Sequence, residues 1–167
     1  RYVRGVVWAL NEAQEGRFSS GFDAVIAGDV PLGAGLSSSA SLQAALAMFL
    51  NTAGLLGEGP GIDFDDSARM ALAKTLRRSE NAYVGVQSGL LDQFSVLFGR
   101  AGFALSLDCR DLAYERLPLG DPAPAIIVCD SKTSRRLADG MYNQRRLECE
   151  KVVAHFQAKR GSESVSW

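Results

Sequence analysis

The stretch DVPLGAGLSSSAS, residues 29–41, joins a glycine-rich turn to three consecutive serines and then to a helix-like apolar run. Gly33 and Gly35 permit backbone angles that other residues avoid, and they let a ligand approach the main chain. Serine is favoured at helix N-termini, where the first N–H groups lack internal partners and the helix dipole is positive. The stretch therefore predicts a phosphate site on a helix N-terminus.

Two well-known phosphate loops differ from this stretch at decisive positions. Ala34 follows Gly33 where a Walker P-loop has lysine, and Ser38 occupies the position of the third glycine of the dinucleotide fingerprint. A glycine turn with a simple serine cap is the structural alternative. Two glycines and three serines exceed what a cap requires, so we favour phosphate binding.

The bulk composition is that of an ordinary globular protein of about one domain: 167 residues, 47% hydrophobic, 22% charged, with a net charge of −1. The near-zero charge disfavours a nucleic-acid surface, and no apolar run is long enough to span a membrane. Cys109, Cys129 and Cys149 match neither a zinc spacing nor a disulfide framework, which favours a reducing cytoplasm.

Hydrophobic periodicity predicts a mixture of helices and strands, and hence an α/β or α+β class. In the helix expected at residues 133–157, the clearest apolar face consists of Cys149, Val152, Val153 and Phe156. Expected strands cover residues 22–30, 102–107 and 125–129, with polar, proline-containing turns between the last two. Expected helices cover residues 2–10, 42–50, 65–84, 88–98 and 133–157, with loops at 11–20 and 54–62.

Two acidic residues stand out by their position. Glu80 falls in the last turn of a helix, where the dipole disfavours a carboxylate. It is either a solvated surface residue or a ligand of Mg²⁺, which takes one or two carboxylates together with phosphate oxygens. Asp92 lies among apolar neighbours and is either a plain first-turn acid or a functional group with a partner. Gly89 slightly favours the functional reading, because a glycine opening a helix is costly unless something approaches the backbone.

The segment YNQRRLECE, residues 142–150, places a tyrosine and several charged residues on one helix. Arg145, Arg146 and Glu150 fit a solvent-exposed face with ion pairs. Tyr142 fits either that face or the wall of a ligand pocket.

These segments together resemble the GHMP kinase superfamily and, within it, the galactokinase family. Residues 31–41 resemble the superfamily's second motif. Three further segments resemble galactokinases: GLLDQF at 89–94, ALSLDCR at 104–110 and the helix at 142–150. The matching segments keep the family's order and spacing over about residues 2–156.

The resemblance implies a kinase that uses ATP and Mg²⁺ to phosphorylate galactose at its C1 hydroxyl, in the Leloir pathway of galactose metabolism. Ser39 and Glu80 would hold the magnesium ion, and Asp92 would take the proton from the sugar's anomeric hydroxyl. Gly89, Asp92 and Tyr142 would line the galactose pocket. The residues that would cradle the ATP phosphates are Gly33, Ala34, Gly35, Leu36, Ser37, Ser38 and Ser39.

The resemblance also implies a two-part α/β architecture, the GHMP kinase fold. Residues 1–99 would belong to a ribosomal-S5-like N-terminal domain that binds ATP, and residues 100–167 would begin a ferredoxin-like C-terminal domain. The family's sugar-binding motif and glycine-rich third motif are missing, so we expect an internal fragment of a longer, cytoplasmic, monomeric enzyme. Within the matching segments, Ser88 stands where galactokinases often have cysteine.

Two other functions stay open at this level. A galactokinase-like regulator would bind ATP and galactose without catalysis. A related GHMP kinase would act on N-acetylgalactosamine or another small alcohol. A phosphate-transfer assay separates an enzyme from a sensor, whereas the missing sugar motif decides the substrate.

Residues 1–167 alone are expected to lack kinase activity, because two of the family's motifs are missing from them. The measurement is galactose-dependent ADP release by the purified chain with ATP and Mg²⁺, with an intact galactokinase as positive control. Robust ADP release by the 167-residue chain would contradict this expectation.

Overall fold

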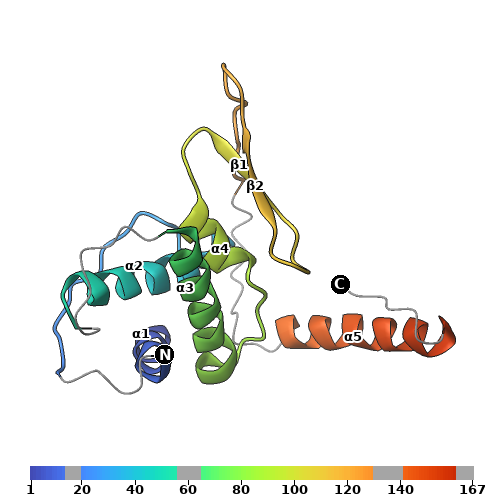
Figure 1. Cartoon of the computed structure of the whole chain (residues 1–167), viewed down its shortest axis with the longest axis horizontal. Helices are drawn as coiled ribbons and strands as arrows, with labels where there is room; N and C mark the ends of the chain where they lie inside the picture. The colour runs from blue at the N-terminus through green and yellow to red at the C-terminus, as the bar shows by residue number, and fades with distance from the viewer. Residues whose placement is uncertain (14–19, 56–64, 130–140, 161–167) are drawn as a thin grey trace.

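A computed structural model of the chain describes residues 1–13, 20–55, 65–129 and 141–160. A cluster of helices packs together, and a two-stranded antiparallel sheet and a long helix extend from it in different directions (Figure 1). In chain order, the elements are α1 (Tyr2–Ala13), α2 (Ser38–Thr52), α3 (Asp66–Arg78), the π-helix η1 (Ser79–Val84), α4 (Leu91–Phe98), β1 (Phe103–Leu107), β2 (Tyr114–Pro118) and α5 (Met141–Arg160).

The helices α1, α2, α3 and α4 each bury one apolar face in a common core. Leu50 of α2 and Leu76 of α3 are fully buried there. In α2 the helical period of apolar residues includes Phe49, but this side chain is 41% exposed, and the smaller Ala44 and Ala47 are buried instead.

In α4, the rings of Phe94 and Phe98 stack with their centroids 4.4 Å apart. The ring of Tyr114 from β2 meets Phe94 edge-on, with a centroid distance of 5.2 Å. This aromatic contact ties the sheet to the helical core.

The helix expected from about residue 65 is confirmed, and its two ends have clear physical causes. Asp65 caps it at the start, where the carboxylate accepts a hydrogen bond of 2.7 Å from the Ala68 N–H. At the other end the helix widens into η1 and stops at Gly85, whose φ of +91° suits glycine. The π-turn has no signal in the sequence, and it carries Glu80.

Two expected strands are wrong. Residues 22–30 and 125–129 have no regular secondary structure, and Val25 and Ile127 are 97% and 83% exposed. A strand needs a neighbour for its N–H and C=O groups, and among the described residues only β1 and β2 pair. Alternation of apolar residues predicts a strand's faces but cannot supply its partner.

β1 confirms the strand expected at 102–107, but its partner was expected to be a turn. β2 pairs antiparallel with β1, with Phe103 opposite Pro118 and Leu107 opposite Tyr114. Proline at the end of a strand of this two-stranded sheet is tolerated, because an edge position requires fewer N–H donors. β2 contains a proline and the charged residues Glu115 and Arg116, so its sequence lacks the apolar alternation that predicts a strand.

The last helix begins at Met141 in the described part, and the expected residues 133–140 lie outside it, as does most of the loop expected at 54–62. Its expected apolar face is not buried: Val152 and Phe156 are about half exposed. α5 reaches away from the cluster in Figure 1, which leaves that face without a covering element in the described residues. None of the described helices has the length and apolar character needed to cross a membrane.

Phe94→Ala is expected to lower the free energy of unfolding by about 3–5 kcal/mol, because it opens a cavity between α4 and β2. Urea unfolding followed by circular dichroism measures the change. Val96→Ala on the same helix is the control: Val96 is 38% exposed, so its truncation costs less than about 1 kcal/mol. Equal losses for the two variants would contradict the assigned core.

Candidate functional site

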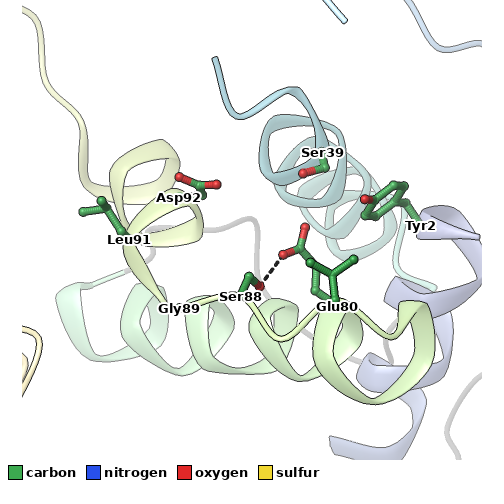
Figure 2. Close-up of a pocket in the computed structure, with 8 residues that line it drawn as sticks. Tyr2, Ser39, Glu80, Ser88, Gly89, Leu91 and Asp92 are labelled. Carbon is green, nitrogen blue, oxygen red and sulfur yellow. Dashed lines mark hydrogen bonds between the residues drawn. The ribbon is translucent and has the colours of Figure 1, made fainter. Parts of the chain in front are cut away.

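A pocket of about 190 Å³ lies where four of the sequence-predicted site residues meet: Ser39, Glu80, Gly89 and Asp92. These residues come from α2, η1, the loop 85–90 and α4, and Figure 2 shows them around one opening. The complete lining is Tyr2, Ser39, Glu80, Val86, Ser88, Gly89, Leu91 and Asp92. Residues 33–38 of the predicted phosphate loop are not part of this lining.

The start of α2 has the free N–H groups that the serine stretch predicted. The first helical bond runs from the Ser41 N–H to the Ser37 carbonyl, so the N–H groups of residues 38–40 have no partner inside the helix. Ser37 occupies the cap position with φ +56°, but its side chain makes no capping hydrogen bond. The serines therefore do not serve as a simple cap, and the positive end of α2 faces the Ser39 side of the pocket.

The glycines before α2 adopt the backbone angles that motivated their selection. Gly33 and Gly35 have φ of +75° and +76°, which L-residues with side chains rarely adopt. A Cβ atom on either glycine would meet no atom within 4 Å. Backbone geometry, and not internal crowding, explains both glycines.

Glu80 is not a solvated surface glutamate, because it is only 4% exposed. Its Oε1 accepts a hydrogen bond of 2.8 Å from Gln43 Nε2, and its Oε2 accepts one of 2.5 Å from Ser88 Oγ (Figure 2 draws the second). Burying an ionised carboxylate is expensive unless charge and hydrogen bonds compensate it. The surface alternative for Glu80 is thus wrong, and a site that uses its charge is favoured.

Asp92 is exposed, in contrast to several apolar neighbours in the sequence. Phe94 and Leu97 of α4 face the core, whereas Asp92 in the first turn lines the pocket. The positive end of the α4 dipole stabilises a carboxylate at this position. Asp92 is thus a first-turn acid and also a wall of the pocket, so the two readings are compatible.

Gly89 lies two residues before α4, in the loop, and does not open the helix itself. A Cβ atom there would meet no atom within 4 Å, and the φ of Gly89 is not in the left-handed region. Neither strain nor packing among the described residues therefore requires a glycine here. Open space beside the backbone remains, as expected if a ligand approaches it.

Tyr2 lines the pocket but has no distinctive signal in the sequence, where it is one apolar position of the first helix. Burial raises the pKa of its phenol, the negative charge of Glu80 raises it further, and a hydrogen bond with Ser39 lowers it. The net shift is upward, so the Tyr2 hydroxyl keeps its proton at neutral pH. It is a neutral polar group between Ser39 and Glu80.

α5 supports the loop 85–90 through Asn143. The Asn143 side chain accepts a hydrogen bond of 2.9 Å from the Gln87 N–H and donates one of 3.1 Å to the Gly85 carbonyl. Arg146 adds a bond of 3.2 Å to the Gln87 carbonyl. The Tyr142 side chain, which the sequence singled out, lies outside the described part of the structure. The contacts described between this segment and the loop are those of Asn143 and Arg146, and the role of Tyr142 stays a prediction.

The pocket residues fit a magnesium ion bound together with phosphate groups. Ser39 and Glu80 present a hydroxyl and a carboxylate, which are oxygen ligands of the kind Mg²⁺ prefers. In the described part of the chain no three His, Cys, Asp or Glu side chains cluster as a metal cage. Mg²⁺ commonly takes only one or two protein carboxylates and keeps waters or phosphate oxygens as its other ligands.

Comparison with known proteins identifies the family. The sequence profile of the "GHMP kinases N terminal domain" matches residues 1–100. The chain belongs to the GHMP kinase family. This GHMP kinase chain is 48% identical over 159 residues to a galactokinase of Roseiflexus sp. (strain RS-1), covering 93% of the chain and 37% of the relative.

Two further relatives agree. A galactokinase of Exiguobacterium sibiricum is 42% identical over 159 residues, covering 95% of this GHMP kinase chain and 38% of the relative. The crystal structure of Lactococcus lactis galactokinase complexed with galactose matches with a TM-score of 0.72 and 29% identity. That match covers 98% of this chain and 39% of the other, so the chain spans under two fifths of the relatives' length. The mixed helix and strand fold expected from the resemblance is confirmed.

Asn143→Ala is expected to loosen the loop 85–90, because the two hydrogen bonds of the Asn143 side chain to that loop are lost. The amide of Gln87 should exchange with solvent about 5- to 30-fold faster, as expected for one or two lost bonds. Hydrogen exchange with mass spectrometry or NMR measures it. Gln144→Ala is the control, since Gln144 bonds only Glu148 among the contacts described. An unchanged Gln87 exchange rate would refute the bracing role.

Proposed function

We propose that this chain is part of a galactokinase, which transfers the γ-phosphoryl group of ATP to the C1 hydroxyl of galactose. The products are galactose 1-phosphate and ADP, and the reaction belongs to galactose metabolism. The names of the relatives support the reaction and the substrate. The galactose-bound neighbour with the same fold supports a sugar site in this region of the protein.

The observation that carries the proposal is the convergence of Ser39, Glu80, Gly89 and Asp92 on one pocket. Ser39 and Glu80 lie far from each other in the chain, and Gly89 and Asp92 lie on a third stretch; the sequence pattern and the resemblance point to all four. A chance set of residues from these segments has no reason to share a pocket. Phosphoryl transfer depends mainly on positioning and charge stabilisation, and this set contains groups for both tasks.

Asp92 is the residue that we assign as general base. Its side chain is exposed, lines the pocket and lies in the first turn of α4, where it can reach a bound hydroxyl group. It would take the proton of the attacking C1 hydroxyl as the oxygen bonds to phosphorus. Gly89 leaves space next to it, and we assign Gly89 and Tyr142 to the walls of the sugar site.

We assign the start of α2 to the phosphates of ATP and the pair Ser39 and Glu80 to Mg²⁺. The N–H groups of residues 38–40 would donate to phosphate oxygens, and Gly33 to Ser37 would continue the cradle. Ser39 and Glu80 would contribute oxygens to the metal. When bound, Mg²⁺ would offset the negative charge that develops on the transferred phosphoryl group.

The domain assignment and the cellular setting are part of the same proposal. Residues 1–99 would form part of the ATP-binding N-terminal domain, and 100–167 would begin the C-terminal domain. The end of the family match at residue 100 supports that boundary. We further propose that the protein is cytoplasmic, since widely separated, unpaired cysteines favour a reducing compartment. We also propose that the full-length protein is a monomer.

Asp92→Ala in the full-length polypeptide is expected to reduce galactose-dependent ADP formation by about 10²–10⁴-fold, the usual contribution of a general base. ATP affinity should stay nearly unchanged, since the assigned phosphate contacts lie on α2. A coupled ADP assay and calorimetric titration with ATP measure the two quantities.

Asp111→Asn is the matched control, because Asp111 is an exposed acid whose bond to the Ala113 N–H an asparagine can keep. It should retain the activity of the unmodified enzyme. Wild-type turnover by Asp92→Ala would show that the base assignment is wrong. Tight ATP and galactose binding by the unmodified protein without transfer of labelled phosphate would instead identify a sensor.

A further inference from the structure

The Glu80 carboxylate is held at both oxygens by side chains from two other segments. Gln43 Nε2 of α2 donates to Oε1 at 2.8 Å, and Ser88 Oγ of the loop 85–90 donates to Oε2 at 2.5 Å. Rotation of the carboxylate about its last bond would break both hydrogen bonds at once. Its orientation in the pocket is therefore determined by Gln43 and Ser88.

Gln43 is fully buried, yet only one end of its amide is bonded. Its Oε1 atom has no hydrogen-bond partner in the described part of the chain, whereas its Nε2 bonds Glu80. Buried amides usually satisfy both ends, so an amide with one unsatisfied end needs a reason. The hydrogen bond to Glu80 is that reason, because a hydrogen bond to a carboxylate is stronger than one to a neutral acceptor.

Ser88 has a choice of acceptors, and its geometry favours the carboxylate. Its Oγ lies 2.5 Å from Glu80 Oε2 and 3.3 Å from Asn81 Oδ1. A hydroxyl has a single hydrogen, which goes to the closer and charged oxygen. A separation of 2.5 Å is at the short end of O–H···O hydrogen bonds, so the Ser88 hydroxyl is held firmly by the carboxyl group.

No basic side chain neutralises this carboxylate within the described residues. The ion pairs found there join other acids to arginines, such as Glu12 to Arg78 and Glu150 to Arg146. Glu80 therefore has two neutral donors, little exposure to water and one side that lines the pocket. A buried charge without an opposite charge is costly, and a cation in the pocket would remove that cost.

We propose that Gln43 and Ser88 are positioning residues that hold the Glu80 carboxylate oriented to bind a divalent cation. Neither residue touches the cation in this arrangement; each acts through the carboxylate. Hydrogen-bonded partners of metal ligands orient them in this way and raise metal affinity. The inference rests on the proposed metal role of Glu80 and adds the two residues on which that role depends.

The test measures binding of Mn²⁺ to the full-length polypeptide by electron paramagnetic resonance, in the presence of ADP. Gln43→Met, which keeps the volume but removes the donor, and Ser88→Ala are each expected to weaken Mn²⁺ binding by about 10–100-fold. ADP affinity without metal should not change. Ser88→Cys fills the space of the serine side chain but is a weaker donor, so it should still bind Mn²⁺ less tightly than the parent, whereas a role in packing alone would leave the affinity unchanged.

Three controls make the result decisive. Ser95→Ala removes an exposed hydroxyl of α4 and should bind Mn²⁺ as the parent does. Thermal unfolding verifies that each variant is folded; if Gln43→Met is not, the Ser88 series decides. If Glu80→Gln loses Mn²⁺ while Gln43→Met and Ser88→Ala retain full affinity, the positioning role is overturned and the metal role survives. If Glu80→Gln also retains full affinity, the metal role itself is wrong.

Discussion

A carboxylate withdrawn from water and held by neutral donors is the constraint on which the rest of the site depends. Two hydrogen bonds to Glu80 do not fully replace the hydration that the charge loses on burial. The arrangement therefore persists only where the surrounding core is rigid enough to prevent the side chain from turning outward. The Glu80 carboxylate also has no positively charged partner among the described residues, and the pocket that it lines has room for a cation.

The helical core meets the first requirement. α2 brings Gln43 and Ser39 to the site along one helix, with the buried Leu50 anchoring that helix in the core. η1 places Glu80 opposite, in a π-turn that ends at Gly85. π-turns are uncommon and occur often at functional sites, because they displace a side chain from its regular helical position. α5 then holds the loop that delivers Ser88 and Gly89.

The residue types of the site could be predicted from the sequence, but several of their roles could not. The glycines and serines of residues 33–39 have a local signature, since turn angles and helix starts are properties of short segments. Glu80 stands out in the sequence only by its place in the last turn of a helix. Its burial depends on Gln43, far away in the chain, and on a π-turn that periodicity does not predict. Tyr2 and Asn143 were missed because a single residue on a regular helix carries no information about what it faces.

The sequence by itself determined where the helices lie and the left-handed glycine turn before α2, because these depend on periodicity and local backbone preference, and it predicts that residues 29–41 bind phosphate. It also determined the family, through motifs whose order and spacing are preserved. Only the tertiary structure decided that Glu80 is buried, that Asp92 faces the pocket, and that residues 22–30 form no strand in the described chain. Burial and strand pairing depend on segments distant in sequence, and the residue pattern of one segment does not show which other segment packs against it.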